Sequence, residues 1–169
     1  MWVMKIIGID PGTAIMGFGI LDVEGQNLSV ITYGAIRTFP EKTTAERLLD
    51  IHQGLEELMR KYKPDCMSVE QLFFNRNITT AMTVGQARGV ALLTAAEAGI
   101  PVHEYTPLQV KQSVTGEGRA DKHQVGYMVR LLLHLDEIPR PDDVADALAI
   151  AICHAHTCGT KRKLEISWR

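Results

Sequence analysis

The stretch IIGIDPGTAIMGFGIL, residues 6–21, determines how the chain starts to fold. Val3–Ile9 is mostly β-branched and apolar, which predicts a buried strand. Asp10-Pro11-Gly12 predicts a tight turn, after which Ile15–Val23 returns as a second strand. Leu28–Thr38 offers a third strand, so the start of the chain predicts an antiparallel three-stranded meander.

Helical and strand patterns alternate beyond the meander. The predicted helices are Thr43–Tyr62, Thr79–Ala98, Lys122–Leu135 and Asp143–His156, and the predicted strands are Cys66–Glu70 and Pro101–Tyr105. Gln71–Asn77 is expected to be a loop, and Thr106–Asp121 to be partly loop because it contains Pro107, Gly116 and Gly118. Three strands followed by alternation predict an α/β fold with a mixed five-stranded sheet flanked by helices.

Length and composition favour one cytoplasmic domain. The 169 residues contain no repeat or linker, which predicts a single domain over 1–158 and a loose polar tail over 159–169. Lys and Arg number 18 against 20 Asp and Glu, so any nucleic-acid surface must be a local patch. The odd set of 3 cysteines and a start unlike a signal peptide favour a reducing cytoplasm. No apolar run approaches the ~20 residues of a membrane span.

Two acids end predicted strands. Asp10 precedes the Pro-Gly turn, and Glu70 closes the apolar strand Cys66–Glu70. An Asp before Pro-Gly often hydrogen-bonds its own turn, and a solvated strand end would explain Glu70 equally well. If the two strands are neighbours, however, both carboxylates face one crevice at the edge of the sheet, where α/β proteins tend to bind ligands.

Three further acids begin the last predicted helix, in RPDDVADALAIA, residues 140–151. Asp142 suits an N-cap, and acids in a first turn oppose the helix dipole by about 0.3–1 kcal/mol. Asp143 and Asp146 lie on one helical face, and Asp146 sits among apolar neighbours where an unpaired charge is costly. Together with Asp10 and Glu70 they would form an all-oxygen site suited to Mg²⁺ or Mn²⁺, and two such ions can hydrolyse a phosphodiester.

Supporting residues have two interpretations each. Lys111, Arg119, Lys122 and Arg130 could form a basic patch for phosphates, although nearby acids dilute it. Phe73 and Phe74 could be core residues, or one could stack on an exposed base. Gly85 and Gly89 in one helix suggest close approach of another backbone, either from this chain or from a second copy.

Two other motifs are weaker candidates. ICHAHTC, residues 152–158, gathers Cys153, His154, His156 and Cys158, but neighbouring helical positions point in different directions and cannot all reach one zinc. IGIDPGT, residues 7–13, is also similar to the phosphate loop of actin-like and sugar-kinase ATPases. Those proteins need two large lobes, for which this chain is too short.

Five motifs together resemble the RuvC Holliday-junction resolvases, which have an RNase H-like fold. They are IIGIDPGTAIMGFGIL, VEQLFFNRN, VGQARGVAL, EYTPLQVKQSVTGEGRADKHQV and DDVADALAIA, in that order. The resemblance assigns the four metal-binding acids to Asp10, Glu70, Asp143 and Asp146; the family also allows His at the third position. It matches Lys111 and Lys122 to the basic residues near the cut bond, and Phe73 to the aromatic inserted at the junction centre.

The resemblance also implies a function. It predicts a homodimeric endodeoxyribonuclease of recombination and repair that binds four-way DNA junctions and uses two Mg²⁺ per site, for which Mn²⁺ would substitute. Paired symmetric nicks would leave 5′-phosphate and 3′-hydroxyl ends, in cooperation with the RuvA–RuvB motor. Two alternatives stay open: a junction binder without chemistry, and an RNase H-fold enzyme acting on structured RNA.

Overall fold

The computed structural model of the chain describes residues 2–72 and 78–167, with side chains as far as residue 161. The elements, in chain order, are β1 Val3–Asp10, β2 Ile15–Glu24, β3 Asn27–Arg37, α1 Thr44–Tyr62, β4 Cys66–Glu70, α2 Ile78–Glu97, β5 Val102–Tyr105, α3 Pro107–Thr115, α4 Lys122–Leu132 and α5 Asp142–Ser167. The predicted α/β fold with a mixed five-stranded sheet is confirmed.

The strands form one sheet in the order β3-β2-β1-β4-β5. β1 pairs with β2 and β2 with β3 in antiparallel fashion, as the meander predicted, whereas β1–β4 and β4–β5 are parallel. Because β1 and β4 are parallel neighbours, their carboxyl ends meet at one edge of the sheet. Asp10 and Glu70 end these two strands, so both acids lie at that edge.

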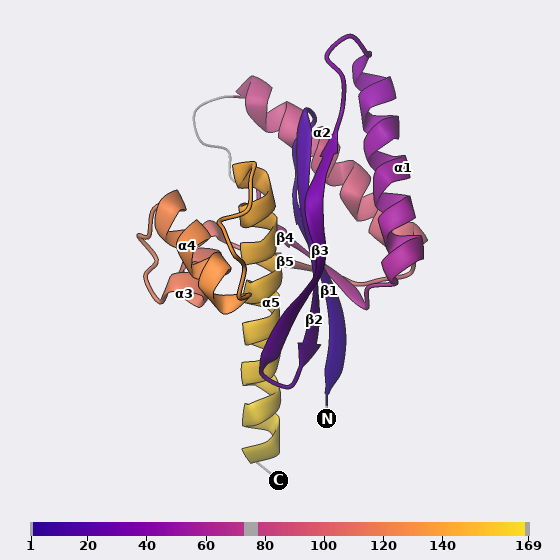
Figure 1. The fold of residues 1–169 in the computed structure, drawn as a ribbon. Coiled ribbons are helices and arrows are strands. Elements are labelled where there is room, and N and C mark those ends of the chain that lie inside the picture. The colour runs from indigo at the N-terminus through magenta and orange to yellow at the C-terminus, as the bar shows by residue number, and fades with distance from the viewer. Residues whose placement is uncertain (1, 73–77, 168–169) are drawn as a thin grey trace.

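Helices cover both faces of the sheet (Figure 1). α1 and α2 cover one face, where Ile51 and Ala91 pack with Ile7 and Ile9 of β1. α5, flanked by α3 and α4, covers the other face, where Leu148 packs with Ile6. The alternation of Ile6 and Ile7 between the two cores follows from the two-residue period of a strand.

Glycines of β1 and β2 seat the first half of α5 against the sheet. A Cβ on Gly8 would collide with the backbone oxygen of Ala147, and one on Gly17 would collide with that of Asp143. Only glycine allows backbones to approach this closely. Gly17 pairs with Asp10 across the two strands, so the same contact brings the start of α5 over Asp10.

Two segments are more helical than predicted. The prediction that the last helix ends at His156 and leaves a loose tail over 159–169 is wrong, because α5 continues to Ser167. Gly159 does not end the helix, since TKRKLEIS, residues 160–167, contains good helix formers and no proline. Part of Thr106–Asp121 forms α3, which begins at a capping box of Thr106 and Gln109, with Pro107 in the first turn where proline is favoured.

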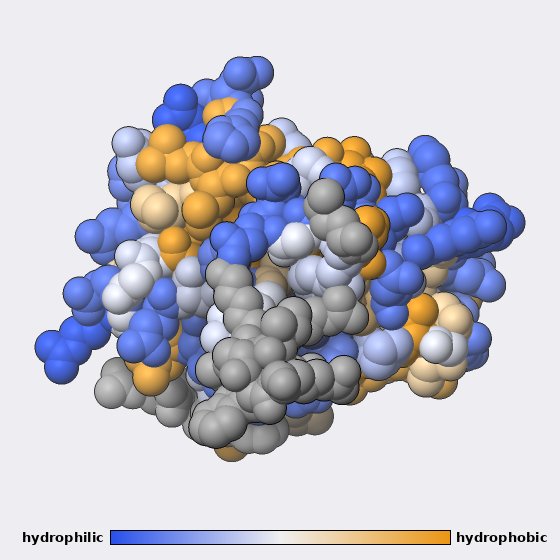
Figure 2. Space-filling model, turned by 90° about the horizontal axis from the view of Figure 1, so that it is seen from below, coloured by the Kyte–Doolittle hydropathy of each residue, from blue (hydrophilic) through white to orange (hydrophobic). Residues whose placement is uncertain are grey.

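Figure 2 views the molecule from the end at which Figure 1 places both chain ends. Hydrophilic side chains cover most of this face, and hydrophobic ones gather in separate areas. Of the helices in the described ranges, none combines the length and apolar character needed to cross a bilayer.

Candidate active site

One cleft brings together five of the residues predicted from the sequence. It has a volume of about 370 Å³ and its charged lining residues are Asp10, Glu70, Lys111, Lys122 and Asp146. These side chains come from five elements, β1, β4, α3, α4 and α5. The cleft therefore depends on the assembled fold rather than on any local motif.

Lys122 forms an ion pair with one of the acids in the cleft. It opens α4, whose capping box of Asp121 and Gln124 fixes the start of the helix beside the cleft. Its Nζ lies 3.5 Å from a carboxylate oxygen of Asp146, while the side chain of Lys122 is 74% exposed and that of Asp146 is 32% exposed. An ion pair this exposed is weak, so Lys122 keeps the freedom to contact another anion.

Uncompensated negative charge gathers in the cleft. Burial, and then repulsion from Asp146, Asp143 and Glu70, raises the pKa of Asp10 to about 8, and Lys122 offsets only part of this. Burial is also the main cause of the raised pKa of Glu70. The pKa of Asp146 is raised by burial as well, despite the opposing effect of Lys122. The attraction of Asp146 in turn raises the pKa of Lys122.

Asp143 lies beside this cleft rather than in its lining. It borders an adjoining shallow groove together with Thr13, Thr79, Thr80 and Thr83. Its charge still acts on Asp10. The prediction that Asp143 and Asp146 share one crevice with Asp10 therefore holds for Asp146, whereas Asp143 reaches the cleft electrostatically from its border.

The groove lined by Thr13, Thr79, Thr80 and Thr83 was not predicted from the sequence. Thr13 Oγ1 donates a hydrogen bond to the backbone oxygen of Thr83 at 3.0 Å, which ties the turn after β1 to α2. The available signal was the concentration of threonines in ITTAMT, residues 78–83. Hydroxyl groups of this kind commonly contact nucleic-acid phosphates.

Asp142 is not the N-cap that the sequence predicted. It is the first residue of α5, and its Oδ1 accepts a hydrogen bond of 2.8 Å from Nη1 of Arg140. The neighbouring Arg140 competes for the carboxylate that would otherwise cap the helix. Its position in the first turn still opposes the helix dipole.

The remaining predicted residues differ in position. Phe73 and Phe74 lie outside the described residues. Arg130 donates from Nε to the backbone oxygen of Asp136 at 3.0 Å, so it supports its own loop. The basic patch at the cleft thus consists of Lys111 and Lys122.

The donor chemistry of the cleft fits a hard divalent cation. Its charged acceptors are carboxylate oxygens, and no His or Cys belongs to its lining. Oxygen donors of this type are those that Mg²⁺ and Mn²⁺ prefer. Among the side chains of residues 2–72 and 78–161, no three of the acids bring one oxygen each within 4.8 Å of one another, as expected for like charges that repel.

The fold and the acidic cleft define an RNase H-like nuclease. The yeast mitochondrial Holliday junction resolvase Ydc2 has the same fold, with a TM-score of 0.67 at 15% identity over 93% of this chain and 80% of that one. The family profile of crossover junction endodeoxyribonuclease RuvC matches residues 6–154. The chain belongs to this family, whose nucleases are metal-dependent.

Individual relatives agree along nearly the whole chain. The crossover junction endodeoxyribonuclease RuvC of Heliobacterium modesticaldum is 61% identical over 154 residues, 91% of this chain and 95% of the relative. The RuvC of Chloroflexus aurantiacus is 56% identical over 97% of this chain and 100% of its own length. The solved structure of Thermus thermophilus RuvC in complex with a Holliday junction substrate has a TM-score of 0.89 at 40% identity, covering 94% of this chain and 96% of that one.

Proposed function

We propose that this chain is a structure-selective endodeoxyribonuclease that resolves Holliday junctions in homologous recombination and DNA repair. One observation carries the proposal: Asp10, Glu70 and Asp146 meet in one cleft beside two lysines. The similarity to Thermus thermophilus RuvC, whose structure contains a Holliday junction substrate, supports the choice of DNA. Because the proposed substrate is chromosomal DNA, the cytoplasm is the expected compartment.

The acids would hold two Mg²⁺ ions. Asp10, Glu70 and Asp146 would supply ligands from within the cleft, and Asp143 would supply one from its border. When bound, such ions supply an activated water and stabilise the leaving oxygen of a phosphodiester, and Mn²⁺ would substitute. The raised pKa values of Asp10, Glu70 and Asp146 favour this assignment, because a cation would relieve the burial and repulsion that cause them.

The lysines would hold the DNA strand. Lys122 extends an exposed ammonium group next to Asp146, within reach of a phosphate entering the cleft. Lys111 lines the same cleft from α3. Positive groups at this place neutralise the phosphate on binding and the charge that develops when the bond breaks. Cleavage would leave 5′-phosphate and 3′-hydroxyl ends, and Phe73 stays the predicted base-stacking residue.

A second copy of the chain would complete the enzyme. Ile78, Met82 and Leu93 of α2 are 77%, 61% and 57% exposed and recur on one helical face. On the same face a Cβ on Gly89 would meet nothing within 4 Å, so no neighbour among the described residues accounts for that glycine. A two-fold dimer through α2 would present two equivalent clefts to two matching strands, which explains paired symmetric cuts.

Dimerisation has a direct test. Leu93→Arg should convert a dimer to a monomer in analytical ultracentrifugation, because it places a charge on the apolar face of α2. Leu49→Arg is the matched control, since Leu49 is similarly exposed, at 52%, but belongs to α1 rather than α2. Equal sedimentation of both variants and the parent protein would remove this interface from the proposal.

The nuclease activity is tested with a labelled mobile four-way junction and a matched linear duplex, each with Mg²⁺ or EDTA. We expect Mg²⁺-dependent cutting of the junction alone. Equal cutting of the linear duplex would contradict the resolvase assignment, and tight junction binding without cutting would indicate an inert binder. Inclusion of a structured RNA tests the RNA alternative. Stimulation by RuvA–RuvB on the junction would support that proposed partnership.

A further inference from the structure

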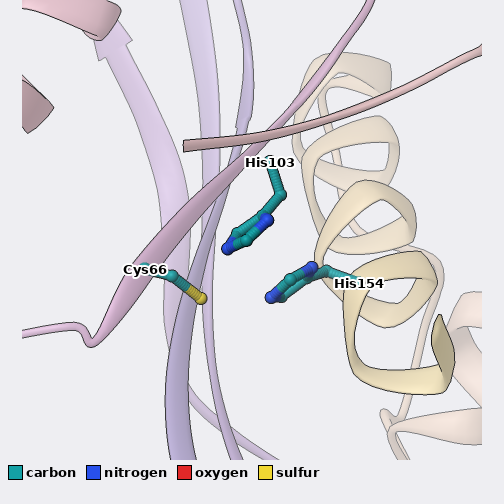
Figure 3. Close-up of side chains that lie close together, drawn as sticks. All are labelled: Cys66, His103 and His154. Atoms are coloured by element: carbon teal, nitrogen blue, oxygen red, sulfur yellow. The ribbon is translucent and has the colours of Figure 1, made fainter. Parts of the chain in front are cut away.

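A second ligand cluster lies between the sheet and α5, away from the acidic cleft. Cys66 of β4, His103 of β5 and His154 of α5 point toward one another (Figure 3). One ligand atom from each lies within 4.8 Å of the others. Cys66 and His154 are almost fully buried, with 3% and 1% of their surfaces exposed. The sulfur and both imidazoles are therefore gathered in the interior by three different elements.

Cys158 is a candidate for a fourth ligand. It follows His154 by one helical turn, so both side chains lie on the same face of α5. Its Sγ lies 3.4 Å from Nε2 of His154. Ligand atoms that share one zinc ion at about 2.0–2.3 Å stand roughly 3–4 Å apart. The Cys158–His154 spacing meets this requirement. Cys66, His103 and His154, whose ligand atoms lie within 4.8 Å of one another, need to contract further around an ion, and Cys158 would turn toward them from the same face of α5.

The surroundings of His154 hold its ring in a ligand orientation. The hydroxyl of Tyr105 lies 2.6 Å from Nδ1 of His154. This hydrogen bond leaves Nε2 directed to the side of Cys158. Metal-binding histidines nearly always have their other ring nitrogen fixed by such a bond. The rings of His103 and His154 stack with centroids 4.2 Å apart, which holds the two imidazoles next to each other.

The charge balance suits a buried cation. Burial lowers the pKa of His154 to about 4 and lowers that of His103, and nearby Lys161 adds to both effects. Neutral imidazoles are the form that binds metal. Burial raises the pKa of the Cys66 thiol to about 12. Two thiols that release their protons to solvent on binding a divalent ion would yield a neutral complex, which an apolar interior tolerates.

We propose that Cys66, His103, His154 and Cys158 form a structural Zn²⁺ site. The ligand set of two sulfurs and two nitrogens is typical of tetrahedral zinc. Soft thiolate ligands also separate this site from the oxygen-lined cleft, which suits Mg²⁺. The two sites would thus bind different metals in the same chain.

The structure also explains how ICHAHTC contributes to such a site. Its four potential ligands do divide between two faces of α5. Cys153 and His156 face α3, where Cys153 Sγ lies 3.6 Å from the backbone oxygen of Gln109 and His156 contacts Ser113. His154 meets Cys66 and His103 on the side of the sheet, and Cys158 contacts His154 from one turn further along α5. The site therefore combines one pair of residues from the sheet, Cys66 and His103, with one pair from α5, His154 and Cys158. The motif alone contains only the second pair.

The proposed ion would fasten the elements that carry the catalytic acids. Cys66 precedes Glu70 by four residues on β4, roughly 13 Å along the strand. His154 follows Asp146 by eight residues on α5, roughly 12 Å along the helix. Between them Ser68 Oγ donates to the backbone oxygen of Ile150 at 3.3 Å. Zinc would add a cross-link at the far end of this strand-helix contact without entering the cleft.

The test is metal binding by the full chain. Protein purified under reducing conditions without chelator is analysed for zinc by mass spectrometry, then stripped and titrated with Zn²⁺ and Co²⁺. We expect one zinc per chain, Co²⁺ absorption typical of tetrahedral coordination with a thiolate charge-transfer band, and a rise of several degrees in the melting temperature on adding Zn²⁺. The Co²⁺ spectrum of the unmodified chain does not depend on whether any variant folds.

Matched variants locate the ion. Cys66→Ser and Cys158→Ser should lose the zinc and the charge-transfer band, while Cys153→Ser and His156→Ala on the same helix should keep both. Asp146→Asn should also keep the zinc, which separates this site from the cleft and from the proposed nuclease function. Zinc-free protein that shows no Co²⁺ charge-transfer band, or equal loss in Cys153→Ser, would overturn the proposal.

Discussion

The acidic cleft and the Cys66–His103–His154–Cys158 cluster occupy opposite parts of the same strand-helix pair, β4 and α5. In the cleft, Glu70 and Asp146 are only half-buried, and each has a raised pKa. In the cluster, Cys66 and His154 are buried and His154 is held by Tyr105. The proposed functions account for this difference, because a cleft that would admit a DNA phosphate has to be open and charged, whereas a zinc site that would stabilise the fold can be closed and neutral.

The largest expected effect comes from removing one charge in the cleft. Asp146→Asn keeps the shape of the side chain but weakens its binding of a cation, so junction cutting should fall by at least about 100-fold. Junction binding should change little, because the lysines remain. Single-turnover cleavage and an electrophoretic binding assay measure the two quantities.

Asp142→Asn is the matched control for this substitution. Asp142 belongs to the same helical turn but pairs with Arg140 outside the lining of the acidic cleft. Its cleavage rate should stay within a few-fold of the parent. If Asp146→Asn instead lost its circular dichroism signal, Asp146 would be a structural residue and the distinction between open and closed sites would fail.

Lys122→Ala should have the next largest effect. Loss of its ammonium group beside Asp146 should slow cutting by roughly tenfold and reduce the dependence of junction binding on salt. Lys42→Ala is the control, because Lys42 forms only a surface ion pair with Asp50 on α1. Equal effects of both substitutions would mean that Lys122 contributes general charge rather than a contact in the cleft.

The acids were predictable because their signals are local. Asp10 and Glu70 end apolar strands, and Asp146 follows one helical turn after the start of α5, so position alone suggested each of them. The meeting of Asp10 and Glu70 needed only that β1 and β4 be parallel neighbours, whereas Asp146 also needed α5 to pack closely on β1 and β2. The placement of Asp143 at the border of the cleft was not predictable, since it depends on how Gly17 seats the helix.

The Cys/His cluster was not predictable from sequence spacing. It depends on the register of β4 against β5, which pairs Ser68 with His103, and on the rotation of α5 about its axis. Neither quantity can be read from a motif. The extension of α5 to Ser167 was missed for a related reason, because Gly159 signals a helix end and only the favourable residues after it override that signal.

The two sites should respond to pH with opposite signs in chelated protein. Burial, and then repulsion from Asp146, Asp143 and Glu70, raises the pKa of Asp10 from 3.8 to about 8, and Lys122 lowers it in part. Between pH 3.8 and about 8 the folded state therefore binds more protons than the unfolded state. Stability should fall as pH rises through this range. In Asp10→Asn the melting temperature should fall by several degrees less over this pH range than in the parent protein. Addition of Mg²⁺ should restore the melting temperature at high pH in the parent protein but not in Asp10→Asn.

The smallest expected effect concerns His154. Its pKa is lowered from 6.5 to about 4 by burial, with contributions from His103 and Lys161. In chelated protein the unfolded state binds more protons within this window, so stability should be complete above pH 6.5 and decline as pH falls toward 4. His154→Gln should weaken this dependence, measured as melting temperature against pH relative to His156→Gln. If the melting temperature of His154→Gln declines with falling pH as much as that of the parent protein, His154 is not buried in its neutral form. The contrast between a neutral cluster and a charged cleft would then fail.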